Sequence, residues 1–179
     1  MQLDLSQPLP WADNAVDGIY SEHFMEHLSQ AQGLRLLHEC RRVLKPGGVV
    51  RIATPDMAEM VRDYVNDYKH PEFARFGMDW TANSCERLNM SMRWWGHQWV
   101  YDEQELTRAG NTVGLRVLGR YGFGESPHEI LRNLEHRQYS GLILEFEKPR
   151  RRLDPEERPL VSIAIPAYNP RFFRQALES

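Results

Sequence analysis

Apolar residues recur with two different periods along this chain, and the periods predict a mixed α/β order. A short apolar run at 16–20 lies between turn residues, as a buried strand does. Residues 30–44 carry apolar side chains at helical spacing, with basic side chains near the end, where the helix dipole favours them. Residues 49–54 are rich in β-branched side chains and predict a second strand. A strand–helix–strand unit of this kind builds a parallel sheet.

Turn and capping residues mark the ends of the next elements. Residues 45–48 read Lys-Pro-Gly-Gly, which ends the first helix because proline cannot continue it and a Pro-Gly pair suits a type II turn. Ser21 or Ser29 is the candidate N-cap of that helix. A second helix is predicted at 56–68. Residues 70–100 show no clear periodicity, which is typical of a functional insertion or lid.

Residues 102–147 again alternate between helical and strand periodicity. The elements predicted there are a helix at 102–114, a strand at 115–121, a short helix at 127–135 and a strand at 141–147. Asp102 is the candidate N-cap of the helix, Glu105 stands three residues later, and Gly114 ends it. The final strand alternates apolar and polar side chains, so one of its faces is predicted to be buried.

Composition narrows the class of protein. The chain has 179 residues, of which 41% are hydrophobic and 26% charged, a balance typical of soluble globular proteins. The net charge of −3 offers no electrostatic basis for nucleic-acid binding, and no run of about 18 apolar residues predicts a membrane span. The start lacks the features of a secretory signal, and two cysteines, Cys40 and Cys85, make no disulfide scaffold. We expect a cytoplasmic protein without nucleic-acid or membrane partners.

The pattern also predicts a division of the chain into three parts. Residues 1–148 carry the alternating helices and strands described above. Residues 149–159 are charged and interrupted by prolines, which is typical of a linker. Residues 160–179 predict one strand and a short helix, too little to form a domain of their own.

Three motifs, in this order, resemble a known family. The motifs are Asp4-Leu5 with 8–17, Glu22-His23 with 26–28, and 39–48. Residues 4 to about 148 thereby resemble the C-terminal portion of a class I S-adenosylmethionine-dependent methyltransferase. The resemblance implies an α/β fold with an incomplete Rossmann-like sheet that lacks its first three strands, followed by a C-terminal strand–helix stub. The glycine-rich cofactor loop of the family has no counterpart, because the single G-x-G, at 122–124, follows a late strand.

The resemblance also implies a cofactor and its contacts. S-adenosylmethionine is the implied cofactor, and the implied cofactor-binding residues are Asp4, Leu5, Ser21, Glu22 and His23. Asp4 would approach the adenine amino group, and residues 21–23 would face the methionine end. Ligands of open α/β sheets bind at the carboxyl ends of parallel strands, and residues 21–23 follow such a strand. No metal ligand is implied.

Two histidines are the candidate catalytic residues, His23 and His97. Imidazole titrates near neutrality, so either ring is able to accept a proton from an acceptor that must lose one. His97 lies among tryptophans, which leaves a second interpretation open. In that interpretation a small aromatic core lies under a long loop, and His97 is hydrogen-bonded to the backbone.

The end of the chain resembles a different enzyme class. Residues 161–169 are similar to the first strand of family 2 glycosyltransferases of the GT-A fold. From this we expect that the chain is a piece of a longer two-enzyme polypeptide. We also expect a small-molecule or glycan acceptor for the methyl group, by association rather than mechanism.

Two further functions compete for the same residues. His23 to His27 match the H-x-x-E-H pattern of inverted zinc proteases. On a helix the two histidines would bind Zn²⁺, Glu26 would be the general base, and Glu103 or Glu105 would be a third ligand. The other alternative is a non-catalytic α/β domain that has lost cofactor binding. Such a domain would form a homo-oligomer through an exposed strand edge, at 16–20 or 161–165.

Overall fold

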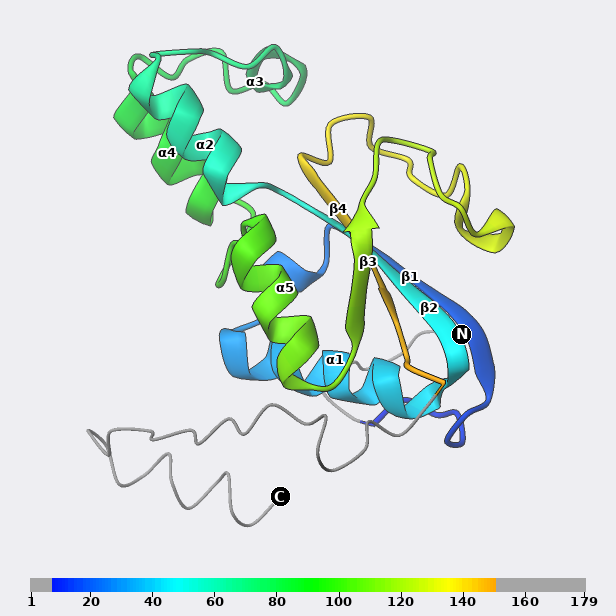
Figure 1. Cartoon of the computed structure of the whole chain (residues 1–179). Helices are drawn as coiled ribbons and strands as arrows, with labels where there is room; N and C mark the ends of the chain where they lie inside the picture. Colours follow the sequence, from blue (N-terminus) through cyan, green and yellow to red (C-terminus); the bar gives the residue numbers. More distant parts are fainter. Residues whose placement is uncertain (1–7, 151–179) are drawn as a thin grey trace, which may run out of the picture.

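Four strands form one mixed sheet in the spatial order β1-β2-β4-β3 (Figure 1). The structure is a computed structural model and describes residues 8–150. The strands are β1 (Val16–Glu22), β2 (Leu44–Thr54), β3 (Arg116–Arg120) and β4 (Leu142–Glu147). β1 and β2 run parallel, whereas β4 is antiparallel to both β2 and β3. The predicted α/β class and its parallel strand–helix–strand unit are confirmed.

Two helices cover one face of this sheet. They are α1 (Gln30–Val43), which joins β1 to β2, and α5 (Glu103–Thr112), which precedes β3 (Figure 1). Ser29 begins α1 with a capping box that includes Gln32. Asp102 begins α5 by accepting a hydrogen bond from the Glu105 amide at 2.7 Å, as predicted. Gly114 follows α5 with a φ of 79°, a conformation that glycine adopts without strain.

The hydrophobic core lies between these helices and the sheet. The helices contribute Leu37, Val43 and Leu106, all fully buried. The predicted apolar face of the last strand is confirmed, because Leu142, Leu144 and Phe146 of β4 are fully buried in the same cluster. Cys40 of α1 is also part of it, and burial raises the pKa of its thiol to about 12. This core fixes the strand ends that carry the candidate site.

The opposite face of the sheet carries buried charge. Arg51 of β2 is fully buried and forms ion pairs with Glu135 and with Glu145 of β4, the latter at 2.7 Å. Its guanidinium also donates to the carbonyl of Gly122 at 3.1 Å. Glu135 and Gly122 belong to the β3–β4 segment (residues 121–141), so Arg51 ties that segment to the sheet. Unpaired charges would be far too costly in this position.

A helical segment extends past the carboxyl end of β2, away from the sheet (Figure 1). This β2–α5 segment (residues 55–102) contains α2 (Met57–Val65), α3 (Glu72–Arg75) and α4 (Ser84–Arg93). The prediction that 70–100 is irregular is therefore wrong. A capping signal was present: Asn83 accepts from the Glu86 amide at 2.9 Å, and Glu86 accepts from the Ala82 amide. Packing of α4 against α2 completes the helix despite its weak periodicity.

Two smaller predictions are corrected by the structure. β2 begins at Leu44, before the Pro-Gly-Gly turn, so the turn is an irregularity within the strand ladder. Gly47 still has the φ of 84° that a type II turn requires. The short helix predicted at 127–135 is a single 3-10 turn, η2 (Glu129–Leu131).

Several predictions fall on residues 1–7 and 151–179, which lie outside the described part of the chain. They concern Asp4 and Leu5, most of the linker, and the whole glycosyltransferase-like tail. The division of the chain into parts therefore stays a prediction. Within residues 8–150, no helix is long and apolar enough to cross a membrane.

The buried Arg51 cluster yields a stability prediction. Replacing Arg51 by methionine leaves Glu135 and Glu145 buried without their cation, and should lower the free energy of unfolding by about 3–5 kcal/mol. Arg116→Met is the matched control, because Arg116 pairs with Glu147 of β4 but its side chain is 65% exposed. That change should cost at most about 1 kcal/mol. Urea denaturation measures both values, and equal losses would contradict the structural role assigned to Arg51.

Candidate functional site

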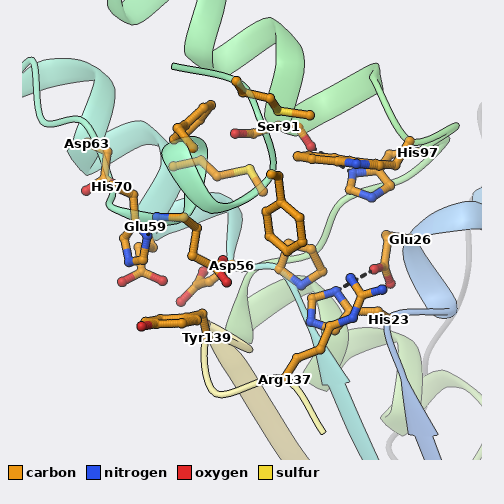
Figure 2. A pocket seen from close by; sticks show the side chains of 18 of the residues that line it. His23, Glu26, Asp56, Glu59, Asp63, His70, Ser91, His97, Arg137 and Tyr139 are labelled. Atoms are coloured by element: carbon orange, nitrogen blue, oxygen red, sulfur yellow. Dashed lines mark hydrogen bonds and ion pairs between the residues drawn. The ribbon is translucent and has the colours of Figure 1, made fainter.

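A cavity of about 380 Å³ opens at the carboxyl ends of β1 and β2 (Figure 2). His23 follows β1 and Asp56 follows β2, and both line the cavity. The β2–α5 segment and the β3–β4 segment supply the other walls. Ligands of open α/β sheets bind at this edge, so the cavity lies where the fold places a binding site.

His23 is held in an unusual backbone conformation at the edge of this cavity. Its φ of 47° lies in the left-handed region, which costs a residue other than glycine about 1–3 kcal/mol. Its amide donates to the carbonyl of Ala53 at 2.8 Å, which ties the end of β1 to β2. The ring bridges two partners, with Nδ1 3.1 Å from Glu26 Oε1 and Nε2 3.1 Å from Ser140 Oγ. Such strain is characteristic of functional positions.

Glu26 is a fully buried carboxylate in the wall of the cavity. Its second oxygen accepts a hydrogen bond from Thr54 Oγ1 at 3.0 Å. Burial alone raises the pKa of the Glu26 carboxyl, but hydrogen bonds from His23, from the backbone and from Thr54 outweigh burial and hold it below its usual range. Glu26 is therefore a carboxylate at neutral pH, with its oxygens held in fixed positions.

His97 belongs to the part of the β2–α5 segment that returns to the sheet, and it lines the cavity on the same side as Glu26 and His23 (Figure 2). Its Nδ1 is 2.7 Å from the carbonyl oxygen of Ser91. A carbonyl only accepts, so Nδ1 carries the hydrogen and Nε2 keeps a lone pair. Burial lowers the pKa of His97, which favours this neutral form. The predicted backbone hydrogen bond of His97 is confirmed.

The aromatic core predicted around His97 is not a core. The exposed tryptophans of this region are Trp80, Trp94, Trp95 and Trp99. Within residues 8–150, the β2–α5 segment extends away from the sheet (Figure 1), so the sheet does not cover these side chains. Trp95 instead lines the cavity, with its ring centroid 5.7 Å from that of His97.

The predicted cofactor-binding residues Ser21, Glu22 and His23 lie in three different environments. Ser21 lies within β1 and pairs with Ile52 of β2. Glu22 ends β1, and its carboxylate accepts from the amides of His136 and Arg137 at 2.9–3.2 Å. Of the predicted cofactor-binding residues within 8–150, only His23 lines the cavity. The cofactor contacts of Ser21, Glu22 and His23 stay predictions.

The geometry that the zinc-protease pattern requires is absent. Residues 25–27 form a single 3-10 turn, and His23 precedes it with a positive φ, so His23 and His27 share no α-helical face. The proposed third ligands are engaged elsewhere. Glu103 pairs with Arg120, and Glu105 pairs with Arg108. The pattern predicts a zinc site only where its residues lie on a regular helix, and here the chain turns sharply after β1.

Other residues of the cavity escaped the sequence analysis. Asp56, Glu59 and Asp63 line one wall from α2 and its N-cap, at a spacing that puts them on one helical face (Figure 2). The three- and four-residue spacing of these carboxylates in the sequence already indicates a shared acidic face of the predicted helix. Arg137 and Tyr139 reach the cavity from the β3–β4 segment, where no local pattern marks them. Their position depends on the ties of that segment to Arg51 and Glu22.

Comparison with known proteins identifies the type of fold. Residues 1–52 match the family model of the methyltransferase domain, which is less than half of the chain. No curated protein sequence matches the chain. Among solved structures, an O-methyltransferase family protein from Burkholderia thailandensis is 14% identical with a TM-score of 0.50, covering 85% of this chain and 36% of that protein.

Two archaeal structures are similar to a comparable degree. A SAM-dependent methyltransferase from Archaeoglobus fulgidus is 15% identical with a TM-score of 0.48, covering 83% of this chain and 66% of that one. A putative methyltransferase from Haloferax volcanii, solved with the Trm112 methyltransferase activator, is 17% identical with a TM-score of 0.48, covering 83% and 60%. The chain thus spans less than two thirds of these proteins. The predicted fold class, a partial Rossmann-like sheet of the methyltransferase type, is confirmed.

The contacts of Glu22 give a prediction about the cavity wall. Glu22→Ala removes a charged acceptor from the amides of His136 and Arg137, each such bond being worth about 1.5–3 kcal/mol. Hydrogen–deuterium exchange of these two amides should accelerate roughly tenfold or more, because 1.4 kcal/mol corresponds to a factor of ten. Glu129→Ala, an exposed position in the same segment, is the control and should leave exchange unchanged. Unchanged exchange in both variants would contradict the anchoring role of Glu22.

Proposed function

We propose that the chain is part of an S-adenosylmethionine-dependent methyltransferase and that the cavity binds the methyl acceptor. The observation that carries the proposal is the position of the cavity. It opens at the carboxyl ends of β1 and β2, next to the strand–helix–strand unit that matches the methyltransferase domain. Fold-level likeness alone would not support a function, but a site at the expected edge does.

S-adenosylmethionine and the methyl acceptor are assigned to different sides of the loop that follows β1. Following the family resemblance, we assign Ser21 and Glu22 to the methionine end of S-adenosylmethionine, and His23, which lines the cavity, to the boundary between cofactor and acceptor. The cavity beyond them takes the acceptor. The sulfonium is already activated, so in-line transfer of its methyl group depends mainly on the proximity and orientation of the acceptor. His23 is well suited to define that orientation, because each of its ring nitrogens has a hydrogen-bond partner and its backbone is held in a strained conformation.

Two histidines remain candidates for accepting a proton from the acceptor. His97 has the more suitable tautomer, because its Nδ1 hydrogen is donated to Ser91 and its Nε2 lone pair is left over. Both ring nitrogens of His23 already have partners, Glu26 and Ser140. His23 would therefore have to exchange its bond to Ser140 for one to the acceptor.

The lining of the cavity favours an acceptor rich in hydroxyl groups, such as a glycan-related molecule. Asp56, Glu59 and Asp63 present carboxylate oxygens, which accept hydrogen bonds from hydroxyls. Trp95 and Tyr139 add aromatic rings that offer flat apolar surface. The resemblance of residues 161–169 to a glycosyltransferase supports the same class of acceptor.

Isothermal titration of the full chain with S-adenosylmethionine, in buffer with a chelator, tests this function. We expect binding in the micromolar range, similar to the substrate affinities of many enzymes. His23→Ala should weaken binding roughly tenfold, because it removes the anchor of the loop after β1. His38→Ala is the matched control, since His38 is exposed on α1 and does not line the cavity. Heat equal to that of buffer injections would overturn cofactor binding by this chain.

A second candidate function is favoured by one observation. Within residues 8–150, β1 has a strand neighbour on one side only, β2. An unpaired edge is a template for pairing with a second copy of the chain. The alternative is thus a non-catalytic domain that forms a homo-oligomer through this edge and binds no S-adenosylmethionine.

Light scattering after size-exclusion chromatography measures this association. If β1 pairs between copies, the full chain should elute with twice the mass of one chain over a wide range of concentration. A single-chain mass at high concentration would contradict the oligomer. Combined with the titration above, the measurement separates the two functions, because only the second predicts association without cofactor binding.

A further inference from the structure

Three metal-binding side chains meet in the wall of the cavity. Glu26, His27 and His97 each place one potential ligand atom within 4.8 Å of the others. All three residues line the cavity, and Figure 2 shows Glu26 and His97 at the same side of it. The group is not the one that the H-x-x-E-H pattern suggested, because His97 joins it from a distant part of the chain and His23 is not a member.

The backbone brings these residues together independently of their side chains. The carbonyl of Glu26 accepts hydrogen bonds from the amides of Gln98 and Trp99, at 2.7 and 3.2 Å. The Gln98 side chain donates to the carbonyl of His27 at 2.7 Å. The segment that carries His97 is thus fastened to the turn that carries Glu26 and His27. A site whose ligands are held in this way is organised before any ion arrives.

The hydrogen bonds around the group match those around metal ligands. His97 donates its Nδ1 hydrogen to the Ser91 carbonyl, which orients the ring and leaves Nε2 as the donor atom. Glu26 is fixed by Thr54 and by His23. Within residues 8–150 the ring of His27 has no hydrogen-bond partner, although it packs edge-on against His97 with centroids 4.9 Å apart. A bound cation would give that ring a partner.

We propose that Glu26, His27 and His97 bind a divalent transition-metal ion, with Zn²⁺ as the best match. One carboxylate and two imidazoles suit zinc, whereas Mg²⁺ and Ca²⁺ prefer oxygen ligands alone. Three protein ligands would leave at least one coordination position open, and because all three residues line the cavity, a molecule bound there could supply the next ligand. A hydroxyl oxygen of the acceptor is the ligand that fits there, a detail that rests on the proposed function.

The proposal reassigns two histidines. A coordinated Nε2 has no lone pair for a proton, so His97 becomes a metal ligand rather than a proton acceptor. His23 becomes a positioning residue that orients the Glu26 carboxylate through its 3.1 Å contact. The binding of the ion itself requires neither cofactor nor activity.

Metal titration of the chelator-stripped full chain tests the site. We expect one Zn²⁺ per chain, and visible absorption bands when Co²⁺ is used in its place. His27→Ala and His97→Ala should each lower zinc affinity by about 100-fold or more, whereas His23→Ala should lower it about 10–100-fold, as positioning residues do. His38→Ala should bind zinc like the unaltered chain. Circular dichroism establishes that each variant is folded.

Two results would overturn the proposal outright, and a third would replace one of its ligands. One is the absence of stoichiometric zinc binding by the unaltered chain. The other is undiminished binding by the folded His27→Ala/His97→Ala double variant, which would place the ion elsewhere. The third is a complete loss of binding in His23→Ala with His97→Ala unaffected, which would make His23 a ligand in place of His97. Because no S-adenosylmethionine is present, zinc binding would stand even if cofactor binding failed, and the two failures are distinguishable.

Discussion

The buried ion pairs of Arg51 with Glu135 and Glu145 are the constraint on which the shape of the cavity depends. They neutralise the Arg51 guanidinium, which is fully buried on one face of the sheet. In doing so they hold the β3–β4 segment against the face of the sheet that α1 and α5 leave uncovered. Gly124 adds to this by donating its amide to Glu135 at 3.0 Å. Leu131 of the same segment is buried as well and packs near Gly18 of β1, so apolar contact adds to the ion pairs in holding the segment in place.

The cavity exists because two excursions from the sheet are fastened to the same strand ends. The β3–β4 segment is anchored by Arg51 and by Glu22, and it brings Ser140 to the ring of His23. The β2–α5 segment leaves at Asp56 and returns at Tyr101, and these two residues form a parallel bridge. Backbone bonds to Glu26 then place the returning chain over the end of β1. Contacts near the strand ends, where the two segments leave and rejoin the sheet, thus fix the positions of both cavity walls.

Charge distribution divides the cavity into two chemically different sides. At the end of β1, buried Glu26 is hydrogen-bonded to His23, and the rings of His27 and His97 pack edge-on against each other beside it. The carboxylates of α2 face them from the other wall, and Asp56 is paired with Arg120. A buried, fixed group is suited to orient one reacting atom, whereas the more open wall is suited to contact the rest of a polar molecule.

The sequence by itself determined the parts that depend on neighbouring residues. Ser29 and Asp102 cap their helices because a side-chain oxygen meets an amide three residues away, and Gly47 and Gly114 adopt positive φ for local steric reasons. The apolar alternation of β4 is equally local. Of the candidate site, His23 and His97 were found from residue type, and both line the cavity.

Only the tertiary structure decided which charged residues are buried and which histidines meet. Arg51 interrupts an apolar strand, and nothing near it in sequence shows that Glu135 and Glu145 neutralise it. The grouping of Glu26, His27 and His97 likewise depends on backbone bonds between segments far apart in the chain. The H-x-x-E-H spacing pointed to His23 instead, because spacing rules assume a regular helix and the chain turns sharply there. Local rules describe the elements, but long-range contacts determine where their ends meet.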